Sequence, residues 1–208
     1  MLTETRWLPL FPLNTVLFPD GVLPLKVFEP RFIDMVRDCM KEEHPFGIIR
    51  INSGNEVGGL PQIDHVGCVA NIANWDMQEL GVLLIQVIGG ARFRILETRE
   101  LAGPRLEARV AIIDPDAPQP ATPMLLACAR ALKSVIDDIN ARQYHEQDKD
   151  FVNPFPATTH FDDSAWVANR WCEILPIPSS ARQKLLELDN AASRLAIIHQ
   201  YLQQHKIL

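Results

Sequence analysis

The sequence predicts an α+β protein in which a β-rich region with one early helix precedes a group of helices. Three observations support this order. Short apolar segments with strand-like patterns occupy residues 8–113, and a single helical repeat interrupts them. Four prolines then fall within residues 114–123, and helical repeats dominate the remaining chain. We therefore expect a β-barrel subdomain over residues 1–116 and a helical-bundle subdomain over residues 117–208.

The first 52 residues contain two proline-punctuated apolar segments, one helix and one strand. Proline has no N–H for a sheet ladder, so the segments that begin at Leu8 and Leu23 are expected at sheet edges or bulges. Pro30 suits the first turn of a helix. The residues of its apolar face recur with helical spacing: Phe32, Ile33, Val36, Cys39 and Met40. The β-branched segment 46–51 is expected to be a buried strand.

Four further strands are expected before the proline-rich segment, after a loop over residues 53–64. Residues 81–89 are almost continuously apolar, which is typical of a strand buried on both faces. The other three expected strands alternate in pattern: 66–73, 91–97 and 106–113. Residues 74–79 are expected to form a hairpin tip. About seven short strands and one early helix imply a closed or partly closed β-barrel.

Four helices are expected after the linker. The first has an apolar seam from Leu125 to Ile139, and a loop over residues 143–159 follows it. Asp162 and Asp163 are expected to cap the second helix, which proline ends after Leu175. The remaining caps are predicted from the polar residues that precede the last two apolar repeats: Ser179 or Ser180, and Asp189 or Asn190.

Several spaced sequence blocks carry a family resemblance. They are Leu8-Pro-Leu-Phe-Pro-Leu, Val16-Leu-Phe-Pro, Leu23-Pro-Leu, Phe28-Glu-Pro-Arg-Phe, Phe46-Gly-Ile, Val66-Gly-Cys-Val-Ala, Gly81-Val-Leu-Leu-Ile, Gly89-Gly-Ala-Arg-Phe-Arg-Ile, Leu175-Pro-Ile-Pro and Arg182-Gln-Lys-Leu-Leu-Glu. In this order they resemble the N-terminal substrate-binding domain of Lon-type proteases, above all its bacterial stand-alone form. The likeness covers nearly the whole chain and is weakest across residues 114–165. It implies a PUA-like β pseudo-barrel followed by a small C-terminal helix bundle.

Composition and motif searches argue against several classes of function. A net charge of −6 disfavours nucleic-acid binding, because such a surface repels phosphate backbones. Without a signal peptide or an apolar run of about 18 residues, we expect a cytoplasmic protein that does not cross a membrane. The four cysteines have no Cys-x-x-Cys spacing and are expected to be free thiols.

No catalytic, metal or cofactor motif is found in the sequence. It has no P-loop, no Gly-x-Ser-x-Gly and no His-Glu-x-x-His. A Lon protease also needs an ATPase domain and a Ser-Lys protease domain, and 208 residues hold neither. The resemblance therefore implies a recognition part without enzymatic activity, so we expect no enzyme, no catalytic residue, no metal and no cofactor.

Candidate binding residues come from the best-matching blocks and from aromatic residues in loops: Leu10, Phe11, Phe18, Glu29, Arg31, Trp75, Phe151 and Phe155. Glu29 and Arg31 have a structural reading, in which they favour the helix start and anchor a loop. Alternatively, they line a groove beside the first strands. Trp75, Phe151 and Phe155 either form a contact surface or cover the junction of barrel and bundle.

The favoured function is binding of unfolded or apolar polypeptides, through an apolar groove or a barrel edge that accepts an extended strand. Two alternatives remain open. The protein could be an adaptor for one specific folded partner, or a small-molecule receptor or undetected enzyme that uses the barrel cleft. RNA binding, known for other PUA-like proteins, is a fold-level analogy that the acidic charge opposes.

Overall fold

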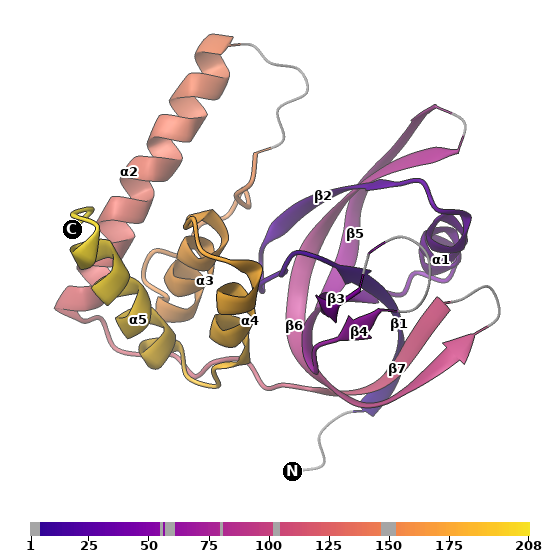
Figure 1. Ribbon diagram of the computed structural model, residues 1–208. Coiled ribbons are helices and arrows are strands. Elements are labelled where there is room, and N and C mark those ends of the chain that lie inside the picture. Colours follow the sequence, from indigo (N-terminus) through magenta and orange to yellow (C-terminus); the bar gives the residue numbers. More distant parts are fainter. Residues whose placement is uncertain (1–4, 55, 57–60, 80, 102–104, 147–152) are drawn as a thin grey trace.

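The chain forms two parts that lie side by side, as a computed structural model of residues 5–54, 56, 61–79, 81–101, 105–146 and 153–208 shows. One part is a β-barrel with a helix against it, and the other is a group of four helices (Figure 1). Over these described residues, no helix is both long enough and apolar enough to cross a membrane. The α+β architecture with C-terminal helices confirms the predicted fold class.

The strands close into a ring. Their bounds are β1 Thr5–Leu13, β2 Val22–Val27, β3 Phe46–Ser53, β4 Gln62–Ile63, β5 Val66–Glu79, β6 Val82–Leu101 and β7 Arg105–Ile112. The order β1-β7-β6-β5-β3 is closed by parallel pairing of β1 with β3, while β2 pairs with β6 and β4 with β3. The expected closed barrel is therefore confirmed, with β2 and β4 added to the ring.

The central part of the barrel differs from the sequence-based prediction. The two strands expected over residues 81–89 and 91–97 are one continuous strand, β6. One edge of β6 pairs with β5, and the other pairs first with β2 and then with β7. The predicted hairpin tip at residues 74–79 is also wrong, since these residues belong to β5. A glycine pair suggests that one strand ends and another begins, but glycine within a strand also permits a bend or the close approach of another segment.

Gly89 is the point of closest approach between β6 and the segment that leads into β2. The N–H of Gly89 donates to the carbonyl of Gly21 at 2.8 Å, and the N–H of Asp20 donates to the carbonyl of Gly89 at 2.8 Å. A Cβ atom on Gly89 would lie 2.0 Å from the carbonyl oxygen of Phe18. Because that neighbour is backbone, no rotamer change can relieve the clash.

Gly89→Ala is therefore expected to lower the free energy of unfolding by about 2 kcal/mol through overpacking. Gly81→Ala is the matched control: it meets nothing within 4 Å, but its φ of +83° is strained for alanine. This second variant should lose about 1 kcal/mol. Urea unfolding of both variants measures the difference, and equal losses would contradict the close-approach explanation.

The helices largely follow the predicted apolar repeats. Their bounds are α1 Pro30–Lys41, α2 Pro123–Glu146, α3 Ser164–Ile174, α4 Ser179–Glu187 and α5 Ala191–Gln204. Pro30 begins α1, Asp163 caps α3 by accepting from the N–H of Ala165 at 2.8 Å, and Asn190 caps α5. The predicted serine cap of α4 is wrong: the helix begins directly after Pro178 without a side-chain cap. Helix α2 extends further than its apolar seam indicated.

Apolar packing joins the two parts as well as filling each of them. Phe11 stacks on Phe32 of α1 with ring centroids 4.2 Å apart, inside the barrel. Val16, Phe18 and Val66 instead belong to the same buried cluster as the bundle residues. The helical part therefore rests on the barrel through a shared core.

A buried ionic group, which we call the arginine joint, fixes the same interface and consists of Arg92, Asp116 and Arg194. Asp116 bonds to Arg92 of β6 at 3.3 Å and to Arg194 of α5 at 2.9 Å. Arg92 also donates to the carbonyls of Leu186 and Leu188. The linker between barrel and bundle is thus anchored at Asp116 to both parts.

Candidate functional site

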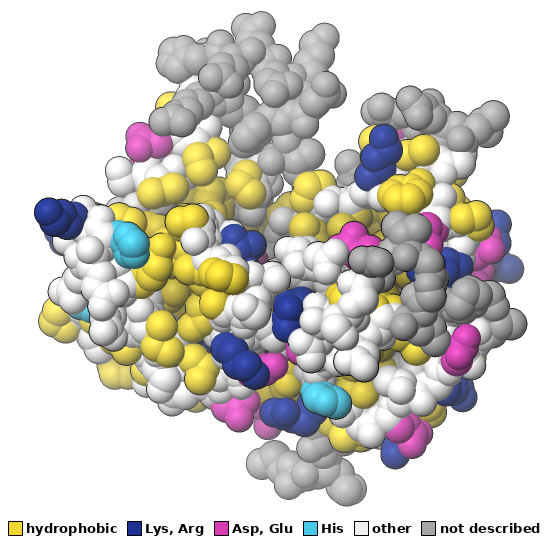
Figure 2. Space-filling view, viewed as in Figure 1, with side chains coloured by type: hydrophobic (Ala, Val, Ile, Leu, Met, Phe, Trp, Pro, Cys, Tyr) yellow, Lys and Arg dark blue, Asp and Glu magenta, His cyan; other side chains and the backbone are white. Residues whose placement is uncertain are grey.

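A cleft of about 500 Å³ lies between the barrel and the segment that precedes α3. Its lining residues come from the β1–β2 connection, β2, β6, the segment 153–160 and α3: Asp20, Val22, Gln86, Ile88, Asn153, Phe155, Pro156, Ala157, Thr158, His160 and Trp166. Figure 2 shows the molecule hollowed between the helical part and the barrel, with hydrophobic side chains inside the hollow. This volume falls in the range of ordinary ligand sites.

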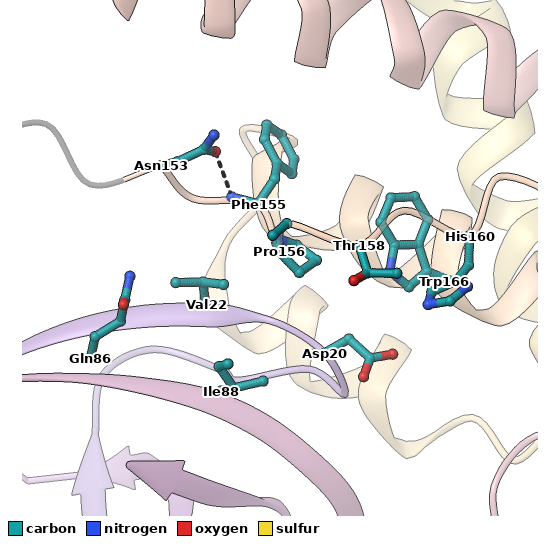
Figure 3. A pocket seen from close by; sticks show the side chains of 11 residues that line it. Asp20, Val22, Gln86, Ile88, Asn153, Phe155, Pro156, Thr158, His160 and Trp166 are labelled. Atoms are coloured by element: carbon teal, nitrogen blue, oxygen red, sulfur yellow. Dashed lines mark hydrogen bonds between the residues drawn. The ribbon is translucent and has the colours of Figure 1, made fainter. Parts of the chain in front are cut away.

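The two walls of the cleft differ in origin. Val22, Gln86 and Ile88 point from the β2–β6 ribbon toward the segment that carries Phe155 and Pro156 (Figure 3). That segment is shaped by a local bond, in which the N–H of Phe155 donates to the side chain of Asn153 at 2.9 Å. The cleft is therefore mainly apolar, with polar groups at its ends.

A second hollow continues from the cleft along the same outer face of the sheet. Strand register places Pro24 opposite Gln86, Lys26 opposite Leu84, and Asn74 opposite Gln86. Opposed residues share a face, so these side chains lie on the face that carries Val22 and Ile88. The second hollow has a volume of about 380 Å³ and shares Gln86 with the cleft. We call the cleft and this hollow together the outer groove.

The free edge of β2 borders the outer groove. Among the described strands, β2 pairs only with β6. Along an antiparallel ladder, hydrogen-bonded residue pairs alternate with non-bonded pairs, and Gly89 bonds to Gly21. Val22, Pro24 and Lys26 therefore stand in non-bonded pairs with β6 and direct their backbone groups away from it. Pro24 has no N–H, so an added strand would lack one ladder bond there. Side-chain contact on the outer face is therefore better supported than regular strand addition.

A hydrogen-bonded pair, Arg170 and Glu173, positions the entrance of the cleft. Arg170 of α3 is fully buried and donates to the carbonyl of Pro19 at 2.7 Å and to Glu173 at 2.9 Å. Glu173 lies against Gly21, where a Cβ would come within 2.2 Å of its Oε1 atom. Burial raises the pKa of Glu173 to about 8, although Arg170 and Arg182 oppose the shift. This pair fixes the backbone on both sides of Asp20.

Among the described residues, no cysteine lines the outer groove. All four cysteines are free and buried. Burial raises the pKa of Cys39 and Cys172 to about 12 and that of Cys128 to about 11, so these thiols stay protonated. Within the described residues, no three His, Cys, Asp or Glu side chains group together as a metal site would require. The geometry suits binding of an apolar ligand.

The candidate binding residues of the first strand region lie inside the protein. Leu10 and Phe18 are 0% exposed and Phe11 is 6% exposed. Phe18 packs in the shared core and Phe11 in the barrel core. They therefore support the fold, and we leave them out of the proposed contact surface.

Glu29 and Arg31 lie at the start of α1 and do not line the outer groove, although Glu29 lines a small hollow of about 50 Å³ beside Phe11 of β1. Arg31 pairs with Glu29 at 3.0 Å and donates to the carbonyl of Glu56 at 3.2 Å. This arrangement ties the helix start to the loop that contains Glu56, which matches the structural reading of these two residues.

Two of the aromatic candidates border the outer groove, Trp75 at the second hollow and Phe155 at the cleft. Trp75 is 54% exposed on β5, and Phe155 is 5% exposed in the wall of the cleft, where it also packs on the bundle core. Phe151 lies outside the described residues. Trp75 offers an exposed aromatic side chain for contact. Phe155 covers the junction of barrel and bundle and also lines the cleft.

Sequence reasoning missed Val22, Gln86 and Ile88. The almost continuous apolar pattern of residues 81–89 suggested burial on both faces, yet Ile88 is 38% exposed. An apolar residue on the outer face of a barrel strand was the available signal. The pattern alone could not show that this face borders a cleft.

Comparisons with known proteins give consistent matches. The family model of the ATP-dependent protease La (LON) substrate-binding domain matches residues 7–204. The chain is 25% identical over 214 residues to a Lon protease of Anaeromyxobacter dehalogenans, which covers 96% of this chain and 23% of that protein. It is 30% identical over 110 residues to protein cereblon of Gallus gallus, covering 51% of this chain and 24% of cereblon.

A solved structure matches over most of both chains. The crystal structure of a Lon N-terminal domain protein from Xanthomonas campestris has a TM-score of 0.69 and 29% sequence identity, and the match covers 93% of this chain and 96% of that one. By contrast, the match covers about a quarter of the length of these two curated relatives.

Proposed function

The chain belongs to the family of ATP-dependent protease La (LON) substrate-binding domains, and from this premise we propose that it is a non-catalytic module that binds unfolded or apolar polypeptides. The outer groove is the proposed binding surface. The observation that carries the proposal is the apolar cleft of about 500 Å³, formed where the barrel meets the bundle.

The shape and chemistry of the groove support an extended polypeptide as the ligand. The cleft and the adjoining hollow follow the β2–β6–β5 face, so a ligand chain can contact both in sequence. Val22 and Ile88 offer apolar contact, while Gln86 can bond to a passing backbone amide or carbonyl. Binding must offset the ordering of a flexible chain, so micromolar affinity is expected.

Ile88→Asp is expected to weaken binding of a reduced, carboxymethylated model protein by at least about tenfold, because a buried unpaired charge opposes apolar contact. Leu96→Asp is the matched control, since Leu96 lies on the same strand, is 47% exposed and does not line the groove. Fluorescence anisotropy of the labelled model protein measures affinity, and circular dichroism checks that both variants fold.

Two results would contradict the proposal. The unaltered protein could fail to bind unfolded chains at concentrations of about tens of micromolar, which exceed the micromolar dissociation constant expected for such a groove. Equal loss in both variants would instead show that the groove is not the contact surface. Stoichiometric binding of one folded protein, with no response to unfolded chains, would favour the adaptor function.

A further inference from the structure

A separate hollow of about 400 Å³ opens between the C-terminal end of α1 and strand β5. We call it the α1 hollow, and its lining residues are Cys39, Met40, Glu43, His44, Pro45, Asn71, Ile72 and Trp75. Trp75 is opposite Ile85 in the strand register, whereas the neighbouring Asn74 is opposite Gln86. The Trp75 side chain therefore lies on the other face of the hairpin from Asn74 and Gln86, and Trp75 also borders the second hollow of the outer groove.

The interior of the α1 hollow is continuous with the barrel core. Met40 and Ile72 are partly buried and pack against that core. Trp75 stands beside them with 54% of its surface exposed. A large apolar side chain that entered the hollow would extend the core and cover the tryptophan ring, which is the type of contact that concentrates binding energy.

At the C-terminal end of α1, beside the α1 hollow, the acidic residues Glu42 and Glu43 outnumber the basic Lys41. Helix α1 ends at Lys41, and the acidic residues Glu42 and Glu43 follow at the end where backbone carbonyls already concentrate negative charge. Glu43 also has a φ of 54°, a left-handed conformation that is unfavourable for a residue with a side chain. His44 lies 3.2 Å from Glu42, and no lysine or arginine is among the lining residues.

We propose that the α1 hollow binds a partner polypeptide segment in which a large apolar residue is flanked by lysine or arginine. The apolar side chain contacts Met40, Ile72 and Trp75. A flanking cation lies near Glu43 and the negative end of α1, and it can also contact the face of the Trp75 ring. An acidic flank is repelled by the same groups. This inference rests on the proposed polypeptide-binding function and adds to it a second contact surface and a charge preference.

The four tryptophans make the test specific. In the ¹⁵N-labelled full chain, the indole signal of Trp75 reports on the α1 hollow and the adjoining second hollow, and that of Trp166 reports on the cleft. Trp7 stacks with Arg99 and Trp171 donates to the carbonyl of Cys128, so both serve as internal references. The probes are three extended peptides: leucine flanked by lysines, leucine flanked by glutamates, and serine flanked by lysines.

The lysine-flanked leucine peptide is expected to shift the Trp75 signal and to bind about fivefold or more tightly than either other peptide. Glu43→Lys should remove the preference for basic over acidic flanks, and Trp75→Ala should weaken the leucine peptide about tenfold. Asp137→Lys, an equal charge change at an exposed position on α2, should leave the preference intact.

Equal affinity for the three peptides, or shifts confined to Trp166, would overturn the inference. So would an unchanged charge preference in Glu43→Lys. The proposed function is tested separately, because Ile88→Asp acts on the outer groove. If unfolded proteins still bind and depend on Ile88 while the peptides do not discriminate, the α1 hollow proposal fails and the groove proposal stands.

Discussion

Asp116→Ala is expected to lower the free energy of unfolding by about 3 kcal/mol, because it leaves two buried guanidinium groups without their carboxylate. Arg92 and Arg194 are 4% and 1% exposed, and both bond to this one side chain. Burial lowers the pKa of Arg92, and Asp116 opposes that shift. The arginines keep their bonds to the carbonyls of residues 185–188, which limits the loss.

Urea unfolding measures this prediction, with Asp137→Ala as the exposed control. Asp137 pairs with Lys133 at 2.8 Å, but both side chains are 60% exposed. Such a surface pair contributes at most about 0.5 kcal/mol. Asp116→Asn should fall between the two variants, since the amide keeps the shape and an acceptor oxygen but loses the charge. A loss below about 1 kcal/mol in Asp116→Ala would show that the joint is held by its backbone bonds alone.

Glu173 is expected to give the protein a stability that falls as pH rises. Its pKa is raised from 4.5 to about 8, because burial outweighs the attraction of Arg170 and Arg182, and Asp20 adds to the rise. Between these two values the folded state binds a proton that the unfolded state has released. The contribution of Glu173 to the free energy of unfolding is therefore fully present below about pH 4.5 and is lost as pH rises to about 8.

Glu173→Gln removes this titration and keeps a neutral acceptor for Arg170. The difference in unfolding free energy between the variant and the unaltered protein should grow in favour of the variant from pH 5 to 9. The full shift from 4.5 to about 8 would correspond to about 5 kcal/mol, and the side chain's 19% exposure reduces it. Glu97→Gln, which removes a carboxylate at a half-exposed position on β6, supplies the baseline for this comparison. A flat curve for Glu173→Gln would show that Arg170 keeps the carboxylate ionised.

Much of the secondary structure was predictable because its signals are local. Pro30 at the start of α1 and the caps Asp163 and Asn190 act within one helical turn, so the sequence shows them directly. The absence of a capping bond at α4 and the continuity of β6 through Gly89 were not predictable. In both places the neighbouring chain, rather than the local residues, determines the backbone.

The candidate site was predictable only in part. Trp75, an aromatic residue chosen as a possible contact residue, is exposed. Leu10 and Phe18, which come from the most recognisable blocks, are buried. Those blocks are recognisable because they build the barrel, so they mark the fold rather than its contact surface. Ile88 and Val22 become visible as a site only when the segment 153–160 is placed opposite them.

Sequence patterns alone predicted a β-rich region followed by a linker and helices, and the spaced blocks identified the family. Apolar periodicity and capping depend on neighbours within a few residues, so both can be read from the sequence alone. Tertiary structure alone decided where the groove lies and which charges are buried. Arg92 meets Asp116 and Leu188, and Arg170 meets Pro19, across separations that no local pattern encodes. Burial then sets the energy of each such contact, because the cost of removing a charge from water depends on everything packed around it.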